Sequence, residues 1–244
     1  MASLTQPPLP IVALDVPSAA DAMRLVRTLG DACGFYKIGS ELFTAEGPAV
    51  VRAVRDAGAD VFLDLKFHDI PQTVRSAARQ AARLGVRLLT VHAAGGASML
   101  RAAREGAEDG AGGTPCGVLA VTVLTSMDEA ALRQASGRDR VVVRDEVLRL
   151  ADAAAGAGLH GVVCSGAEAA ELRDLYGERL ARLVPGIRLA GGATHDQARV
   201  VTPAQASEAG ATYVVIGRAV TAADDPAAAM AMVHAALGQP VGRR

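Results

Sequence analysis

The chain has 244 residues and a formal net charge of −1; 50% of its residues are hydrophobic and 3% are aromatic. A near-neutral charge without a basic run argues against a nucleic-acid groove built from basic and aromatic side chains. No apolar run approaches the about 18 residues of a membrane span. The three cysteines are odd in number and widely spaced, which indicates buried thiols in a reducing cytosol. These features predict a cytoplasmic protein that binds neither nucleic acid nor a membrane.

Short apolar runs alternate along the chain with helix-like stretches rich in Ala, Arg and Glu. Strands are predicted at Ile11–Val16, Phe35–Glu41, Val61–Phe67, Leu88–Ala93, Val118–Thr125, Gly161–Ser165, Arg182–Ile187 and Tyr213–Arg218. Helices are predicted at residues 18–29, 46–57, 72–84, 96–107, 141–156, 167–176, 203–209 and 226–237.

Eight strand–helix units without a composition break indicate a parallel sheet, and eight is the number that closes a TIM barrel. We therefore predict an α/β fold in which residues 1–244 form a single (β/α)8 TIM barrel domain. A doubly wound open sheet is the alternative. It is disfavoured because residues 15–18, after the first strand, read Asp-Val-Pro-Ser and carry no glycine-rich fingerprint.

Lysine is almost absent. Of 25 basic residues only Lys37 and Lys66 are lysine, in a chain rich in Ala and Gly. Such a composition indicates a genome bias that replaces lysine with arginine wherever only positive charge is needed. A lysine can release a proton, whereas arginine in practice never does. The two lysines are therefore predicted to do chemistry, with chance survival as the alternative.

The period of a strand places both lysines with acidic residues. Side chains at positions i and i+2 share a face, and the apolar sets of the first three strands suit packing under the helices. The opposite faces then bring four charged residues into the barrel near its top: Asp15, Lys37, Asp64 and Lys66. The carboxyl ends of the strands carry the chemistry of these barrels. The alternative is a buried ion network that sets strand register, but such networks stabilise poorly.

A second group of residues follows the last two strands. Gly186 and Arg188 end the seventh strand region, and Gly217 and Arg218 end the eighth. The loops after strands seven and eight commonly bind phosphate, because glycine exposes backbone amides and arginine donates paired hydrogen bonds. The small, polar residues 190–197 between them have the composition of a mobile lid, or of an ordinary surface loop.

These residues resemble those of the orotidine 5′-phosphate decarboxylase family. The signature D-x-K-x-x-D-I-P is present as residues 64–71, and Ala-Leu-Asp at 13–15 and Tyr-Lys-Ile-Gly at 36–39 precede it. Further matches are Val-Thr-Val-Leu-Thr-Ser at 121–126, Pro-Gly-Ile-Arg at 185–188 and Val-Ile-Gly-Arg at 215–218. The ordered set is similar to the bacterial-type branch of the family and spans nearly the whole chain.

The resemblance implies a reaction and the residues that perform it. The substrate would be orotidine 5′-phosphate, decarboxylated to uridine 5′-phosphate in pyrimidine biosynthesis without cofactor or metal. Lys66 would protonate the carbon that loses carbon dioxide, and Asp64 would lie against the substrate carboxylate. Asp15 and Lys37 would hold the ribose hydroxyls. Fixed charge of this kind can replace the electron sink that a cofactor supplies in other decarboxylases.

The resemblance also assigns contacts to the base and the phosphate. Thr125 would contact the pyrimidine edge, and Pro185 would pack on the base. Arg188, Arg218 and the amide of Gly217 would hold the phosphate. In the lid, Gln197 would bridge phosphate and base, whereas His195 falls in a stretch without a matching pattern.

Two further residues are implied to act across a subunit boundary. In the family Asp69 reaches into the neighbouring subunit's site, accompanied by Thr73, so a homodimer with shared active sites is expected. Two other functions stay open at this point. One is a related sugar-phosphate decarboxylase or synthase that uses magnesium; the other is a non-catalytic barrel that binds a nucleotide phosphate.

Overall fold

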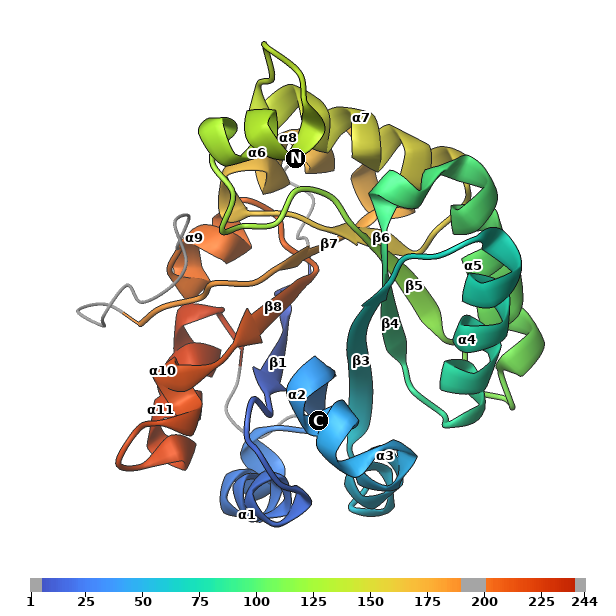
Figure 1. Cartoon of the computed structure of the whole chain (residues 1–244). Helices are drawn as coiled ribbons and strands as arrows, with labels where there is room; N and C mark the ends of the chain where they lie inside the picture. The colour runs from blue at the N-terminus through green and yellow to red at the C-terminus, as the bar shows by residue number, and fades with distance from the viewer. Residues whose placement is uncertain (1–5, 190–200, 240–244) are drawn as a thin grey trace.

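The computed structural model describes residues 6–189 and 201–239. Eight parallel strands follow one another around a closed barrel, and β1 pairs with β8 to complete it (Figure 1). The strands are β1 (Leu9–Ala13), β2 (Phe35–Gly39), β3 (Asp60–Phe67), β4 (Leu88–His92), β5 (Gly117–Val121), β6 (Gly161–Val163), β7 (Ala181–Val184) and β8 (Tyr213–Ile216). The predicted TIM barrel is confirmed, and the open sheet is wrong.

Helices surround the barrel on its outside (Figure 1). They are α1 (Ala19–Leu29), α2 (Ser40–Glu46), α3 (Pro48–Asp56), α4 (Pro71–Arg83), α5 (Gly96–Gly110), α6 (Glu129–Ser136), α7 (Val143–Gly156), α8 (Gly166–Tyr176), α9 (Pro203–Glu208), α10 (Arg218–Thr221) and α11 (Pro226–Ala236). Three short 3-10 segments occur at Gly30–Ala32, Ala93–Gly95 and Gly177–Arg179.

The helix predicted at residues 46–57 is present as α3, but the prediction missed α2, whose first residues fell within the strand predicted at Phe35–Glu41. Gly47, with φ of 60°, separates α2 from α3, and Pro48 then starts α3 at a position where a missing amide hydrogen costs nothing. The sequence prediction also omitted α6, which begins after Asp128, whose carboxylate accepts a hydrogen bond from the amide of Ala131 at 2.8 Å.

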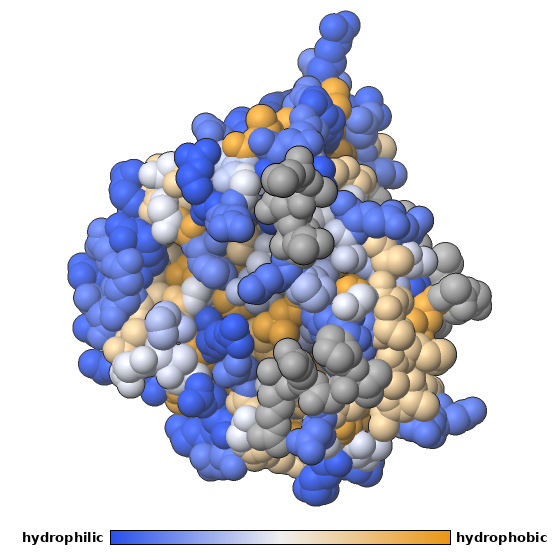
Figure 2. Space-filling model, turned by 180° about the vertical axis from the view of Figure 1, so that it is seen from behind, coloured by the Kyte–Doolittle hydropathy of each residue, from blue (hydrophilic) through white to orange (hydrophobic). Residues whose placement is uncertain are grey.

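The core has two layers, as the alternation of side chains predicts. Val12 and Leu14 belong to the layer between strands and helices, whereas Ile11, Ala13 and Phe62 fill the inside of the barrel. Seen from behind, the molecule has a largely hydrophilic outline, with hydrophobic side chains visible toward its middle (Figure 2). Of the helices described, none is long and apolar enough to cross a membrane.

The strands end earlier than the apolar runs that predicted them. β1 ends at Ala13, so Asp15 lies just past the strand and not within it. β3 is the exception, because it continues to Phe67. Asp64 and Lys66 therefore lie within the strand, near its carboxyl end. The register between β3 and β4 shifts between Leu63 and Phe67, and this irregularity lies where the charged residues are.

Candidate active site

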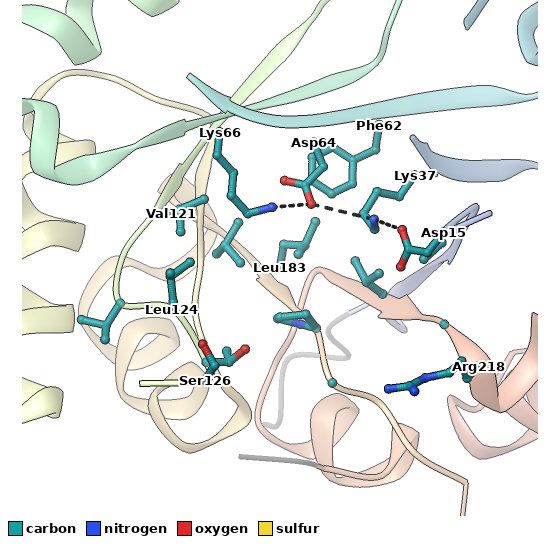
Figure 3. A pocket seen from close by; sticks show the side chains of 18 of the residues that line it. Asp15, Lys37, Phe62, Asp64, Lys66, Val121, Leu124, Ser126, Leu183 and Arg218 are labelled. Atoms are coloured by element: carbon teal, nitrogen blue, oxygen red, sulfur yellow. Dashed lines mark hydrogen bonds and ion pairs between the residues drawn. The ribbon is translucent and has the colours of Figure 1, made fainter. Parts of the chain in front are cut away.

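Four charged side chains from the first three strand regions form one row in the order Asp15, Lys37, Asp64, Lys66 (Figure 3). Lys37 Nζ lies 2.7 Å from Asp15 Oδ1 and 4.0 Å from Asp64 Oδ2. Lys66 Nζ lies 2.8 Å from the same Asp64 oxygen. Each charge therefore has an opposite charge beside it, and the predicted alternating array is present.

The middle of the row is more buried than its ends. The side chains of Lys37 and Asp64 are 11% and 13% exposed, whereas those of Lys66 and Asp15 are 37% and 60% exposed. A buried ion that lost its partner would be costly, because its desolvation would no longer be compensated. The middle of the row is thus enclosed by protein, and the two ends face the solvent and any ligand.

Lys66 reaches this position from a strained backbone. Among the described residues it is the one residue other than glycine with a positive φ, at 51°. A side chain in this left-handed region costs roughly 1–2 kcal/mol. Backbone of this kind persists where its surroundings hold it, and it clusters at functional sites. The strained residue here is the predicted proton donor.

The charged row forms part of the wall of a cavity of about 340 Å³. The polar or charged lining residues are Asp15, Lys37, Asp64, Lys66, Thr125, Ser126, Arg188 and Arg218. The remaining lining residues are Ala13, Phe62, Val121, Val123, Leu124, Val163, Leu183, Pro185, Gly186, Val215 and Gly217. A cavity of this size with an apolar wall and a few convergent polar groups is typical of a small-molecule site.

The cavity has a second, cationic end. Arg218 lies well apart from Lys66, across the cavity (Figure 3). Arg188 also lines the cavity, and its Nε is buried without a hydrogen-bond partner in the part of the chain that the structure describes. A buried donor without a partner is rare in proteins, and a bound anion would satisfy it.

Two predicted site residues that the structure describes do not line this cavity. Asp69 and Thr73 are exposed, and Asp69 Oδ1 accepts a hydrogen bond from the amide of Ile70 at 2.6 Å. Gln197 lies outside the described residues, as does His195. The other nine predicted residues, from Asp15 to Arg218, all line it.

Two histidines lie beside the charged row. The rings of His68 and His92 are 5.5 Å apart between centroids and tilted by 45°. Burial lowers the pKa of His92 below its ordinary value of 6.5, and the nearby His68 and Lys66 lower it further. A neutral His92 at neutral pH adds no charge to the row.

Sequence reasoning missed the support around the row. Thr90, in β4, is fully buried and contacts both Asp64 and Lys66 through its hydroxyl. A β-carbon on Gly39 would lie 3.1 Å from Lys37 Nζ, so this glycine makes room for the lysine. The available signal was slight: a lone hydroxyl in the apolar run Leu88–His92, and a glycine two residues after a lysine.

A closed (β/α)8 barrel with a charged cavity at the carboxyl ends of its strands defines the class of TIM-barrel enzymes. Within that class, a model described as "Orotidine 5'-phosphate decarboxylase / HUMPS family" matches residues 8–233, and the chain belongs to this family.

Several relatives carry the name orotidine 5′-phosphate decarboxylase. One from Moorella thermoacetica is 50% identical over 93% of this chain and 91% of its own length. One from Anaeromyxobacter sp. (strain K) is 51% identical over 92% of this chain and 96% of its own. The crystal structure of the decarboxylase from Lactobacillus acidophilus has a TM-score of 0.85 at 36% identity and covers 95% of this chain and 99% of that one.

Proposed function

We propose that the chain is a carboxy-lyase that converts orotidine 5′-phosphate to uridine 5′-phosphate in pyrimidine biosynthesis. Family membership and the names of the relatives support the substrate. The observation that carries the mechanism is the placement of Lys66: its ammonium lies 2.8 Å from Asp64 and points into the cavity (Figure 3). No cofactor is part of this proposal.

The substrate would lie along the cavity between its two charged ends. Arg188, Arg218 and the amide of Gly217 bind the phosphate, and the Nε of Arg188, which has no hydrogen-bond partner among the described residues, supports this orientation. Asp15 and Lys37 bind the ribose hydroxyls at the opposite wall. Contacts with these non-reacting groups supply binding energy that orients the reacting carbon.

The base would lie over the apolar wall. Pro185 packs on the ring, and Thr125 contacts its polar edge; both line the cavity. Gln197 is proposed to bridge base and phosphate. An apolar wall excludes water, so that the charges around the reacting carbon act at greater strength.

The chemical step breaks one carbon–carbon bond. The substrate carboxylate leaves C6 of the ring as carbon dioxide, and the bonding electron pair stays on C6. Lys66⁺ stabilises this developing charge and then transfers a proton from Nζ to C6, which yields uridine 5′-phosphate. The neutral lysine regains its proton from water. Asp64 holds Lys66 in place and lies against the departing carboxylate.

A direct test is turnover of orotidine 5′-phosphate, followed by ultraviolet absorbance, with and without a chelator. We expect turnover without added metal and no loss in the chelator. Loss of activity that magnesium restores would favour a metal-dependent sugar-phosphate decarboxylase or synthase. Binding of the nucleotide without any turnover would favour a non-catalytic barrel.

We further propose that two subunits share their active sites in a homodimer. Asp69 and Thr73 are exposed and do not line the cavity of their own subunit, which leaves them available to a neighbour. Asp69 of one subunit would then complete the charged row of the other, next to Lys66. A two-fold dimer makes this exchange reciprocal.

Mixing inactive variants tests the shared site. A Lys66→Ala subunit paired with an Asp69→Ala subunit has one site with both defects and one site with neither. Random exchange should restore up to about a quarter of wild-type activity, because half the dimers are mixed and each has one intact site. If exchange is verified by mass and no activity returns, Asp69 serves its own subunit.

A further inference from the structure

The side chain of Thr90 closes a ring of hydrogen bonds that begins and ends on Lys66. The Lys66 amide donates to Thr90 Oγ1 at 2.9 Å, and Thr90 Oγ1 donates to Asp64 Oδ1 at 2.9 Å. The other oxygen of Asp64 accepts from Lys66 Nζ at 2.8 Å. Chemistry settles the direction of each bond, because an amide hydrogen can only donate and a carboxylate can only accept.

Thr90 lies where the pairing of β3 with β4 is irregular. β3 and β4 are in register at Leu63 with Leu89 and again at Phe67 with Val91. Three residues of β3 therefore face a single residue of β4, Thr90. In such a bulge the ladder is interrupted and an extra residue is left unpaired. Within this interruption the Thr90 hydroxyl accepts a hydrogen bond from the Lys66 amide.

The same bulge contains the strained backbone of Lys66, with φ of 51°. This backbone conformation is unfavourable for lysine, so contacts with neighbouring residues must hold Lys66 in it. Thr90 is fully buried and its side chain faces the barrel interior, as Leu88 does. Its hydroxyl bonds both the main chain that carries the ammonium and the carboxylate that orients it.

We propose that Thr90 is a positioning residue: it holds Lys66 in its strained conformation and fixes Asp64, so that the ammonium stays aimed at the reacting carbon. Thr90 does not line the cavity, so it acts through the other two side chains and not on the substrate. The catalytic part of this inference rests on the proposed function. The structural part, that Thr90 holds the Lys66 amide, does not.

Two matched pairs of variants isolate the hydroxyl. Thr90→Val keeps the shape and removes the hydroxyl, whereas Thr90→Ser keeps the hydroxyl and removes the methyl. Thr90→Ser and Thr90→Ala form the second pair, which differs in the hydroxyl alone and serves if Thr90→Val does not fold. Thr122→Val is the control for loss of a buried threonine hydroxyl away from Lys66. The Thr122 hydroxyl is buried and donates a hydrogen bond at 2.7 Å to the carbonyl of Val163.

The kinetic readout is the division of the effect between kcat and KM for orotidine 5′-phosphate. Thr90→Val should lower kcat by at least about tenfold, or about 1.4 kcal/mol of barrier. KM should change by less than about threefold, because the phosphate and ribose contacts are intact. Thr90→Ser and Thr122→Val should keep kcat within about threefold of wild type. Equal losses of kcat in Thr90→Ser and Thr90→Val would overturn the proposal, since packing would then explain both.

The second readout needs no activity. The chain has only two lysines, so protein labelled with [15N]lysine gives two backbone amide signals in an NMR spectrum. In Thr90→Val the Lys66 amide should exchange with deuterium at least about tenfold faster, because its acceptor is gone. The Lys37 signal is the internal control, and Thr90→Ser should match wild type.

The two readouts separate failure of the proposed function from failure of this inference. If the wild type does not turn over orotidine 5′-phosphate, the proposed function fails, and the amide exchange still decides whether Thr90 holds Lys66. If a folded Thr90→Val protein keeps both its kcat and the wild-type exchange of Lys66, the proposal for Thr90 is overturned.

Discussion

Replacing Gly39 with alanine tests whether the space beside Lys37 is part of the site. Gly39 is the last residue of β2, two positions after Lys37, so both face the same side of the strand. Its φ of −92° is open to any residue, so alanine causes no backbone strain. The new β-carbon would lie 3.1 Å from Lys37 Nζ and 3.4 Å from Asp15 Oδ1.

The size of the effect follows from these distances. The contact with Nζ is tighter than a carbon atom normally makes, so the ammonium must shift by a few tenths of an ångström. The shift acts on the 2.7 Å bond to Asp15 and on the 4.0 Å approach to Asp64. A hydrogen bond between charged groups contributes about 1.5–3 kcal/mol, and losing half of it lowers kcat/KM roughly three- to tenfold.

The assay is steady-state turnover of orotidine 5′-phosphate, with thermal unfolding to verify the fold. Gly156→Ala is the matched control, because Gly156 ends α7 and nothing lies within 4 Å of a β-carbon placed there. Gly39→Val should be worse than Gly39→Ala, since its larger side chain displaces Lys37 further. A folded Gly39→Ala protein with kcat/KM within about twofold of wild type would refute the reasoning.

Three further predictions concern Lys66 in the charged row, Arg218 at the phosphate end, and the half-buried His92. Lys66→Arg should keep less than about a tenth of wild-type kcat, because arginine keeps the charge but cannot deliver the proton; higher retained activity would contradict the donor role. Arg218→Ala should raise KM for the phosphorylated substrate roughly ten- to a hundredfold, from about 1.5–3 kcal/mol of lost hydrogen bonding. The phosphate-free nucleoside should be nearly indifferent to that change, and equal losses for both would indicate a structural role. Because the pKa of His92 is lowered in the folded chain, the unfolded chain takes up its proton first as the pH falls through 6.5. The free energy of unfolding should therefore fall below that pH, and urea titrations at about pH 7.5 and about pH 5.5 should show a smaller fall in His92→Gln; an identical fall would contradict it.

The barrel and the row could be predicted because both depend on strand periodicity. Val12 and Leu14 alternate with Ala13 and Asp15, so the face that carries the acid follows once the apolar face is assigned. The closed sheet then brings β1, β2 and β3 side by side, whatever the details of their ends. Residues after the seventh and eighth strands line the same cavity, because the carboxyl ends of all strands lie at one end of the closed barrel.

What could not be predicted depends on register between strands. A strand pattern places Lys66 on the same face as Asp64, but it does not reveal a bulge or a φ of 51° at the lysine. The partner of that bulge, Thr90, is 24 residues away in sequence and lies in an apolar run. The helix α2 was missed for a local reason, since it begins at Ser40 directly after β2 ends at Gly39, without a loop to mark the change.

The two lysines have different surroundings in the structure, although the composition of the chain did not distinguish between them. Lys37 has carboxylates on both sides, at 2.7 Å and 4.0 Å, and its side chain is only 11% exposed. Lys66 ends the row, is 37% exposed, and has Asp64 on one side and the cavity on the other. The side chain of Lys37 is almost buried, whereas that of Lys66 keeps an exposed face toward the cavity, so Lys66 can approach a ring carbon even with Asp69 of a neighbouring subunit beside it. The proposed proton transfer therefore falls to Lys66, and Lys37 is left to hold Asp64 and Asp15 in a fixed arrangement around the substrate.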